Sequence, residues 1–275
     1  MTQDRGILAR RALFAAGGAG VLSLCVPPLA RAAGAAGAPR GPVAGDDPRP
    51  ARTRSAPGGT RAVVERTVAG GPMALALTFD DGPSPIYTPR VLAVLTRHRV
   101  RATFFMLGAN VAKYPDTVRQ VVDLGHVLGN HTWSHPILTA LPAAEVRDQI
   151  ERTNEVIARV GRAGAPVLFR APGGHFAPAA LQVCGELGMR AISWSVDPED
   201  WSNPGTGTVV KRTLGAARTG SIILNHDGAL SLHAVPEHQG LGDRSQTVHA
   251  LHTVIPQLLD AGHHFTTPDT HPKVV

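Results

Sequence analysis

Cysteine and aromatic residues are scarce in this sequence. Its 275 residues include two cysteines, Cys25 and Cys184, and Cys25 lies in an N-terminal segment with the pattern of a signal peptide. Removal of that segment would leave one thiol, so we expect no internal disulfide and a fold held by its core or by a metal. Aromatic residues make up 4% of the chain, which argues against a broad aromatic platform for stacking sugars.

Long basic tracts are also missing. The formal net charge is +6, but part of it comes from residues 1–32, where arginines outnumber acidic residues. No run of Lys or Arg follows in the body of the chain, so we do not expect nucleic acid as a partner. The hydrophobic fraction of 43% is ordinary for a globular protein, and the length allows one large domain or two small ones.

Residues 1–32 have the features of an export signal. Arg10 and Arg11 precede an apolar stretch, and residues 30–32 (Ala-Arg-Ala) form a small-x-small site where a signal peptidase could cut. The paired arginines are typical of the twin-arginine route. Glycines and prolines interrupt the stretch, so we expect no stable membrane span after cleavage. A secreted or cell-wall-associated protein is therefore predicted, with retention by an uncleaved anchor as the alternative.

After this segment, two regions differ in composition and in hydrophobic pattern. Residues 33–71 are rich in Ala, Gly, Pro and Arg without a sustained period, which predicts a flexible linker. From residue 72 to about residue 270, apolar runs alternate with helical patterns, and no internal repeat is present. The predicted organisation is therefore a signal peptide (1–32), a linker (33–71) and one folded domain (72–270).

The folded domain is predicted to be of the α/β class. Candidate strands lie at 75–79, 102–107, 126–129, 167–170, 191–196, 221–224 and 263–266, and helical patterns lie near 88–98, 110–124, 143–161, 177–187, 207–218 and 245–261. Seven strands, each but the last followed by a helix, indicate parallel α/β architecture. Polar motifs follow most of these strands, which favours a distorted (β/α)7 barrel over an open sheet with a single crevice.

Two adjacent acidic residues, Asp80 and Asp81, follow the first predicted strand within the motif TFDDGP (78–83). Gly82 and Pro83 break the strand, and the turn can bring both carboxylates into one pocket. Two close carboxylates repel each other unless a cation or a shared proton compensates, which is the first indication of a metal site. The alternative is an Asx-type turn, in which both side chains bond their own backbone.

Two histidines four residues apart, His131 and His135, lie in the motif HTWSH, directly after the strand at 126–129. The spacing is a weak indication by itself, because the chain has 13 histidines. Its position after a strand places it in the same layer as the paired carboxylates. One Asp and two His would give a metal three protein ligands and leave positions open, as in a catalytic site.

Three further motifs follow later strands: RAPGGH at 170–175, DPEDW at 197–201 and ILNHD at 223–227. An arginine at a strand end can pair with a carboxylate and set its charge state. Glycines let backbone N–H groups approach a ligand closely, and a histidine among carboxylates is a candidate general acid. Each motif also has an ordinary interpretation, as a turn with a surface arginine or as a structural histidine.

Together, the five motifs closely resemble those of the polysaccharide deacetylases of carbohydrate esterase family 4. The resemblance covers about residues 72–268, and five motifs in order are a much stronger indication than any one of them. It implies a hydrolase that removes N-linked acetyl groups from an N-acetylglucosamine polymer, such as cell-wall peptidoglycan or a chitin-type chain.

The resemblance also implies roles for the polar residues. The ligands of a divalent metal, most often zinc, with cobalt or manganese as alternatives, would be Asp81, His131 and His135. Asp80 would act as the general base on a metal-bound water and would be held by Arg170. His226 would protonate the leaving amine and would be held and charged by Asp197.

Substrate contacts are implied in the same way. The Gly173 backbone N–H would stabilise the oxyanion, and Trp201 and Leu224 would line the acetyl pocket. Many family members have Tyr where this chain has Gly173, so only the backbone role carries over. His175 is either a substrate contact or a surface residue.

A long loop at 228–243 directly follows His226. Loops of this length in compact domains are often lids or binding loops, so we predict that it shapes substrate selection. Its deletion should change the preference between polymers and short oligomers, measured as acetate release from each. An unchanged preference would contradict this prediction.

Three alternatives to the N-deacetylase remain at this point. The same residues could serve an acetylxylan O-deacetylase, or a hydrolase of cyclic amides similar to allantoinase. The export signal argues against the latter, because those activities are mainly intracellular. A catalytically silent wall-binding module on the same fold is the third alternative, and the intact ligand set argues against it.

Overall fold

The structure is a computed structural model that describes residues 60–229 and 242–270. The predicted signal peptide, the larger part of the predicted linker and most of the 228–243 loop lie outside the described residues. In the described part of the chain, no helix has the length and apolar character needed to span a membrane.

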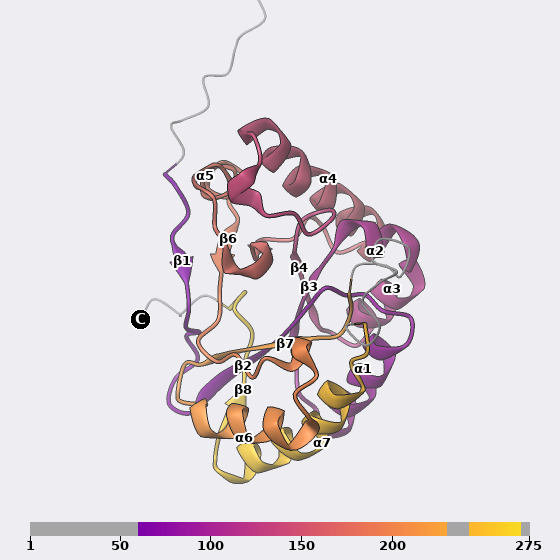
Figure 1. Cartoon of the computed structure of the whole chain (residues 1–275), viewed down its shortest axis with the longest axis vertical. Coiled ribbons are helices and arrows are strands. Elements are labelled where there is room, and N and C mark those ends of the chain that lie inside the picture. The colour runs from indigo at the N-terminus through magenta and orange to yellow at the C-terminus, as the bar shows by residue number, and fades with distance from the viewer. Residues whose placement is uncertain (1–59, 230–241, 271–275) are drawn as a thin grey trace, which may run out of the picture. The chain divides into compact units, whose positions relative to one another are not determined.

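A curved, parallel sheet forms the centre of the domain (Figure 1). Its order is β1-β6-β5-β4-β3-β2-β7, and β8 pairs with β2 beside this path. The strands are β1 (Val64–Glu65), β2 (Ala74–Asp80), β3 (Thr103–Met106), β4 (Val127–Asn130), β5 (Leu168–Phe169), β6 (Arg190–Ile192), β7 (Ile222–His226) and β8 (His264–Phe265). The seven predicted strands are all present, and β1 is additional.

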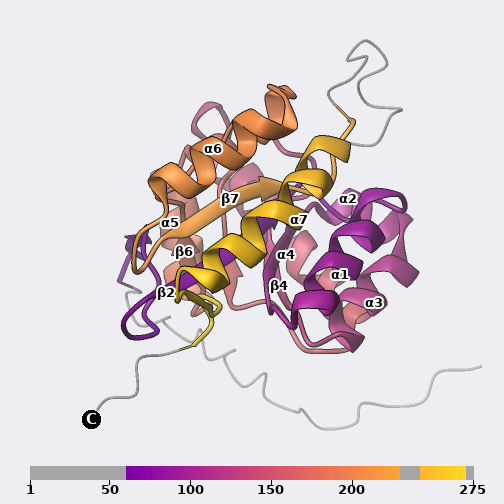
Figure 2. The same ribbon diagram turned by 90° about the horizontal axis from the view of Figure 1, so that it is seen from below.

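Helices pack around the sheet, and Figure 2 shows α6 and α7 side by side along β2 and β7. They are α1 (Tyr87–His98), α2 (Gly108–Lys113), α3 (Pro115–Asp123), α4 (Ala143–Gly161), α5 (Pro178–Glu186), α6 (Thr206–Ala216) and α7 (Ser245–Asp260). Short 3₁₀ helices are η1 (Leu138–Ala140), η2 (Pro172–Gly174) and η3 (Asp200–Ser202). The helix predicted at 110–124 is divided at Pro115, which has no N–H to continue α2 and instead begins α3.

The two edges of the sheet meet through an irregular stretch after β6. Val196 forms a parallel bridge with Ile223, and the Ser195 N–H donates to the Ile222 carbonyl at 3.0 Å. On the other side, β7 pairs with β2 over five residues. The strands therefore form a half-barrel, and an isolated bridge joins its two sides. This confirms the predicted distorted (β/α)7 barrel.

The residues described before position 72 pack against the domain. β1 pairs with β6, and the Val68 N–H donates to the Gly220 carbonyl at 2.9 Å. At Gly185 on α5, an added Cβ would lie 2.1 Å from the Thr60 carbonyl oxygen, so only glycine allows this approach. Residues 60–71, which the sequence assigned to the linker, therefore include the strand β1, and a two-residue strand is too short to give a periodic signal.

The interior of the domain is apolar and closely packed. Every residue of β2 is buried, and the Phe79 ring stacks on the Phe104 ring with 5.0 Å between centroids. Cys184 is also buried, and burial raises the pKa of its thiol to about 12. This thiol is therefore protonated and unreactive at neutral pH.

Candidate active site

The register of the parallel strands brings several motifs to one edge of the sheet. Asp80, the last residue of β2, is paired with His226, the last residue of β7. Likewise Asn130 at the end of β4 is paired with Phe169 at the end of β5. The predicted site motifs after these strands therefore start at the carboxyl ends of neighbouring strands, where barrel active sites are built.

Asp81, His131 and His135 form a group that could hold a metal ion. One ligand atom of each lies within 4.8 Å of the others. The Nε2 atoms of both histidines are 3.5 Å from Oδ1 of Asp81. Ligands placed tetrahedrally about 2.0–2.1 Å from zinc lie about 3.4 Å apart, so these donors fit around one cation.

The donor atoms of Asp81 and His131 also suit a cation. Oδ1 of Asp81 is buried and has no hydrogen-bond partner among the described residues. The Nδ1–H of His131 donates to the Arg170 carbonyl at 2.8 Å, which leaves Nε2 as the free donor atom on the side of Asp81. Burial lowers the pKa of His131 to about 3, so this imidazole is neutral at physiological pH, as a ligand must be.

The backbone around these ligands adopts a conformation that non-glycine residues rarely take. The φ angles of Asp81, Thr132 and His135 are 69°, 70° and 59°. Such left-handed positions cost about 1–3 kcal/mol each and persist where the surrounding structure enforces them. Here the strained residues are two members of the group and one residue between its histidines, so the strain coincides with the site.

Asp80 lies beside the metal-ligand group and forms an ion pair with Arg170. Its Oδ1 accepts a hydrogen bond from the Arg170 guanidinium at 2.7 Å, and its Oδ2 lies 3.6 Å from Nε2 of His131. Both partners of the pair are buried. Burial raises the pKa of Asp80 above its usual range, and the positive charge of Arg170 opposes this shift.

Arg170 is fixed by contacts on every side of its guanidinium. It donates to Thr78 Oγ1 at 2.8 Å, to the Ile192 carbonyl at 3.2 Å and to the Ser193 carbonyl at 2.9 Å. Its guanidinium also lies over the Phe105 ring, 4.1 Å from the centroid. The structure therefore places Arg170 against Asp80, as the family resemblance implied.

The partner of His226 differs from the prediction: it is Asp200 and not Asp197. Nδ1 of His226 is 2.7 Å from Oδ1 of Asp200, and the His226 backbone N–H donates to Oδ2 at 2.8 Å. The Thr247 hydroxyl on α7 also donates to Oδ2 at 2.7 Å. Burial acts to lower the pKa of His226, but the Asp200 carboxylate outweighs it and raises the pKa to about 9.

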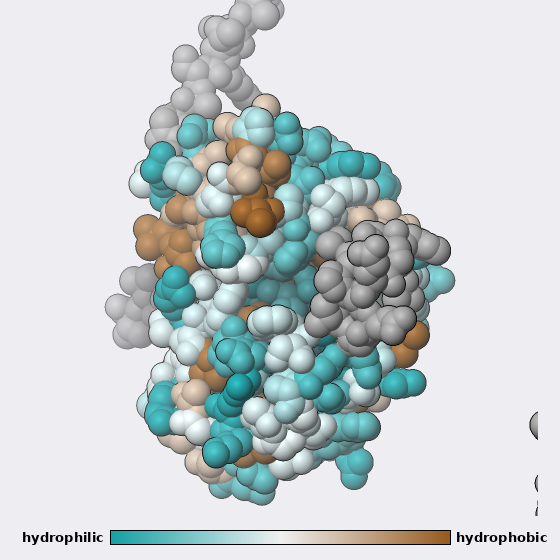
Figure 3. Space-filling view, in the orientation of Figure 1, coloured by the Kyte–Doolittle hydropathy of each residue, from teal (hydrophilic) through white to brown (hydrophobic). Residues whose placement is uncertain are grey.

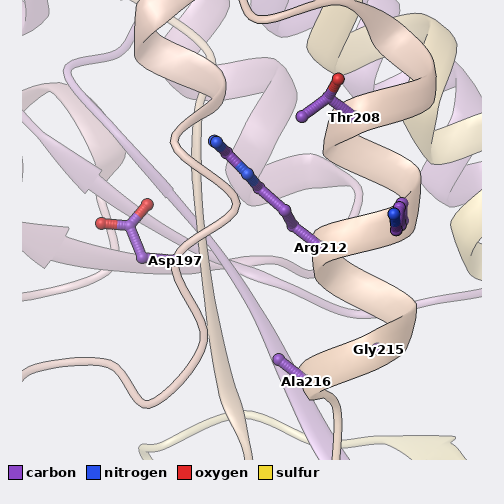
Figure 4. A pocket seen from close by; sticks show the side chains of 6 residues that line it. Asp197, Thr208, Arg212, Gly215 and Ala216 are labelled. Carbon is purple, nitrogen blue, oxygen red and sulfur yellow. The ribbon is translucent and has the colours of Figure 1, made fainter.

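Asp197 makes no hydrogen bond to His226 among the described residues, although it lies near enough for the two charges to interact. It lines an open groove together with residues of α6 that include Lys211 and Arg212 (Figure 4). Its Oδ1 accepts the Glu199 N–H at 2.8 Å, so Asp197 forms the Asx turn that starts the loop. The motif DPEDW contains two Asp residues at strand-end positions, and only the later one, at the start of η3, reaches β7.

The three residues predicted to contact substrate have different environments. Gly173 lies in η2 with φ 60° and is solvent-exposed. Leu224 is buried on β7, paired in register with Thr78, whereas the Trp201 side chain on η3 is 46% exposed. In the described structure, Trp201 is the one aromatic residue that is exposed, in agreement with the absence of a broad aromatic platform.

His175 lies against Gly173. A Cβ added to Gly173 would come within 3.0 Å of Cδ2 of the His175 ring, so this ring occupies the space beside the missing side chain. His175 is also exposed. Both interpretations of His175, as a substrate contact and as a surface residue, are compatible with this position.

Both described ends of the 228–243 loop are anchored near the site. A Cβ at Gly228 would lie 2.3 Å from the Asp81 carbonyl oxygen, so the chain passes directly against the turn that holds Asp81. Arg244 donates to the Gly228 carbonyl at 2.9 Å, and the Tyr87 hydroxyl donates to Asp243 at 2.7 Å. Residues 230–241 lie outside the described residues, and the predicted role of the loop stays a prediction.

Asp227, the residue after His226, was not predicted to have a role. Its side chain is buried and accepts a hydrogen bond from the Thr88 hydroxyl, while Oδ1 has no partner among the described residues. Burial raises its pKa to about 7. Its side chain excludes any residue larger than glycine at position 82, since an added Cβ there would lie 2.6 Å from Oδ1.

The visible surface of the domain carries few apolar side chains (Figure 3). Brown areas in this view are small and separated by polar or neutral surface. The large exposed hydrophobic residues that the structure describes are Val63, Ile86, Leu124, Ile137, Val167, Leu187, Trp201 and Leu259. They are distributed over many elements, and single exposed apolar residues of this kind are normal.

Comparisons with known proteins agree with this geometry. A family profile described as polysaccharide deacetylase matches residues 68–192. A chitooligosaccharide deacetylase of Bradyrhizobium sp. (strain ANU 289) is 42% identical over 195 residues, which are 70% of this chain and 87% of the relative. The chain belongs to the polysaccharide deacetylase family. This confirms the family and the enzyme class predicted from the five motifs.

Solved structures of this family share the fold. The Bc1960 peptidoglycan N-acetylglucosamine deacetylase has a TM-score of 0.67 and 36% identity, covering 74% of this chain and 90% of its own. BA3943 of Bacillus anthracis, a pseudoenzyme of carbohydrate esterase family 4, also has a TM-score of 0.67, with 26% identity and coverage of 76% and 68%. The family fold therefore hosts both active and silent proteins, and the residues of the site must distinguish them.

Proposed function

We propose that this polysaccharide deacetylase is a metal-dependent hydrolase that removes N-linked acetyl groups from N-acetylglucosamine polymers. The observation that carries the proposal is the arrangement of three groups at one edge of the sheet. The metal-ligand group lies beside the Asp80–Arg170 pair, and Asp80 is in register with His226, which is paired with Asp200. A module that only binds polysaccharide would need the metal-ligand group at most, and neither of the other two groups.

The residues that would hold the metal are Asp81, His131 and His135. When bound, a divalent cation supplies Lewis acidity, which polarises a carbonyl and makes water more acidic. The His₂Asp donor set suits zinc, and cobalt and manganese are alternatives. Zinc is our proposal, because neutral imidazole and carboxylate ligands with open positions are typical of its catalytic sites.

Asp80 is proposed to act as the general base. Its Oδ1 is held by Arg170, so Oδ2, which lies on the side of the metal-ligand group, is free to accept a proton from the attacking water. The positive charge of Arg170 favours the ionised carboxylate that a base requires. Attack on the acetamide carbonyl gives a tetrahedral oxyanion, for which the Gly173 backbone N–H is the proposed donor.

His226 is proposed to act as the general acid. Its raised pKa keeps the imidazolium protonated at neutral pH, so it can donate a proton to the amide nitrogen as the C–N bond breaks. The products are acetate and a free amine on the sugar. Trp201 and Leu224 are proposed to line the pocket for the acetyl methyl group.

The proposed substrates are peptidoglycan and chitin-type chains. The support comes from relatives that are named chitooligosaccharide deacetylase and peptidoglycan N-acetylglucosamine deacetylase. Acetylxylan is the alternative substrate, because O-deacetylation would use the same base and metal. The presence of all the residues proposed as ligands, base and acid argues against a silent module.

Acetate release from three substrates tests the proposal. The purified protein, loaded with zinc, is offered chitooligosaccharides, peptidoglycan and acetylxylan in parallel. Acetate together with free amines from either of the first two substrates would support an N-deacetylase. The substrate that reacts would show whether the enzyme acts on cell-wall peptidoglycan or on chitin-type chains. Release from acetylxylan alone would identify an esterase, and metal binding without any release would favour a silent module.

Replacing His131 with alanine is expected to abolish both metal binding and activity. The side chain supplies one of three ligands and is itself fixed by the Arg170 carbonyl. Zinc content after dialysis and acetate release measure the two effects. His126→Ala is a matched control, since His126 is buried on the same sheet but its Nδ1 contacts the Ala102 N–H at 3.2 Å. Zinc retained at wild-type affinity in His131→Ala would contradict the ligand assignment.

Replacing Asp200 with asparagine is expected to move the alkaline limb of kcat/KM to lower pH. The acid form of His226 persists below its pKa, so activity should fall as pH rises through about 9 in the wild type. Removal of the Asp200 charge takes away the largest effect that raises this pKa, while burial still lowers it, so the acid form is lost at lower pH. Asp197→Asn is the matched control. An alkaline limb that shifts equally in both variants would contradict the correction from Asp197 to Asp200.

We also propose that the protein is exported. The support is the N-terminal pattern of paired arginines, apolar stretch and small-x-small site. Fractionation of the producing cells tests this, with the chain expected outside the cytoplasmic membrane. Arg10→Lys together with Arg11→Lys should retain the chain inside if the twin-arginine route is used.

A further inference from the structure

Helix α4 supports the loop that carries the two histidines, through the side chain of Gln149. Its Oε1 accepts hydrogen bonds from two consecutive backbone N–H groups, those of Trp133 at 2.9 Å and Ser134 at 3.0 Å. Its Nε2 donates to the Ser134 hydroxyl at 3.2 Å. One side chain thus satisfies both backbone donors in the middle of the loop.

One further bond lies within the loop, where the His135 N–H donates to Thr132 Oγ1 at 3.1 Å, and others join the loop to neighbouring elements. The Gly108 N–H donates to the Thr132 carbonyl at 3.0 Å, and the Ala109 N–H donates to the Trp133 carbonyl at 3.1 Å. The Thr132 N–H donates to the Asn130 side chain at 2.8 Å. Because α2 holds only carbonyls of the loop, removal of Gln149 would leave two N–H groups without a protein partner.

His135 depends on this support more than His131 does. His131 is buried and its ring is fixed by the Arg170 carbonyl. The His135 side chain is 33% exposed, and within residues 60–229 and 242–270 no hydrogen bond to a neighbouring side chain or carbonyl fixes its ring nitrogens. Apart from its contacts with Asp81 at 3.5 Å and with the edge of the His131 ring, its orientation is set by its backbone, which has φ 59° directly after the two N–H groups held by Gln149.

We propose that Gln149 is a positioning residue of the metal centre: it holds the 131–135 loop so that His135 faces Asp81 and His131, and thereby sets the affinity for the metal. The inference rests on the metal site of the proposed function. Residues that orient metal ligands without binding the metal themselves typically change the affinity for the metal 10- to 100-fold when they are replaced. We expect the same range for Gln149, because a loop freed from it would relax away from the strained φ angles of Thr132 and His135.

The test measures zinc affinity by competition with a chromophoric chelator, using the full chain. Gln149→Leu, which keeps the volume and removes both acceptor and donor, is expected to bind zinc 10- to 100-fold more weakly. Gln149→Glu keeps an acceptor for both N–H groups and should restore affinity to within about threefold of the wild type. Ser134→Ala removes only the hydroxyl contact and should bind normally.

Matched controls separate positioning from a general loss of stability. Gln182→Leu changes the same residue type on α5, where the Gln182 amide donates to Glu186 at 3.0 Å, and should leave zinc affinity unchanged. Thermal unfolding of each metal-free variant, followed by circular dichroism, confirms that affinity is compared between folded chains. If Gln149→Leu does not fold, Gln149→Ala and Gln149→Glu provide the same comparison of a missing and a retained acceptor.

The outcomes distinguish this inference from the proposed function. Weaker zinc binding in Gln149→Leu with rescue in Gln149→Glu would support the positioning role. Equal affinity in the wild type, Gln149→Leu and Gln149→Ala would overturn it while leaving the metal site intact. A wild-type chain with no affinity for zinc, cobalt or manganese would overturn both.

Discussion

Asp80→Asn is expected to lower kcat by about 10²–10⁴ while leaving zinc binding intact. The range is the usual contribution of a general base, and asparagine cannot accept the proton from water at neutral pH. Zinc should remain, because Asp80 is not a member of the ligand group. The amide oxygen can still accept the hydrogen bond from Arg170, so the fold should persist. Steady-state acetate release and zinc content measure the two quantities.

Asp116→Asn is the matched control for this variant. Asp116 is an exposed residue of α3 paired with Arg119, and its replacement should change neither quantity. Activity above about 10% of the wild type in Asp80→Asn would contradict the assignment of the base, because a base worth 10² would leave about 1%. Loss of zinc in Asp80→Asn would instead make Asp80 a ligand.

Arg170→Met is expected to have the largest effect on stability, a loss of about 3–5 kcal/mol in the free energy of unfolding. Removal of the guanidinium leaves the buried carboxylate of Asp80 unpaired. It also leaves the carbonyls of Ile192 and Ser193 without this hydrogen-bond donor. For a domain of this size the melting temperature should fall on the order of 10 °C. Chemical denaturation and calorimetry measure the effect.

Two further variants identify the cause of that loss. Arg147→Met removes an exposed arginine from its pairs with Glu151 and Glu186, and should cost less than about 1 kcal/mol. Arg170→Met combined with Asp80→Asn should be more stable than Arg170→Met alone, because the unpaired buried charge is gone. Equal stability of the single and double variants would show that the carbonyl contacts, and not the ion pair, account for the loss.

The sequence predicted the barrel well because its signals are local. Each main strand is an apolar run between turn residues, and the central strand β2 is buried along its whole length. β1 escaped prediction because a two-residue strand at Val64–Glu65 has no period, and only its pairing with β6 defines it. Similarly, the break between α2 and α3 follows from Pro115, which was present in the sequence but was included in one helical pattern.

The candidate site could be predicted where a motif offers only one set of side chains for a role. His131, His135 and Asp81 lie where their motifs placed them, and Arg170 lies against Asp80. Asp200 was missed because DPEDW offers three carboxylates, and the choice among them depends on the direction of a turn rather than on residue type. The contact of Gln149 with the histidine loop has no motif at all, since it joins α4 to a loop 15 residues earlier.

The pairing of β7 with β2 has a consequence for the nascent enzyme. Strands β2 to β6 follow one another in the sheet in the order in which they are synthesised, so they can assemble as the chain emerges. β7 joins β2 only after most of the domain exists, and this late pairing brings His226 beside Asp80. A chain interrupted before residue 222 therefore holds the proposed metal ligands and the proposed base without the proposed acid. On the proposed mechanism, such a truncated chain is expected to be inactive, because its acid and base meet only through a late long-range pairing.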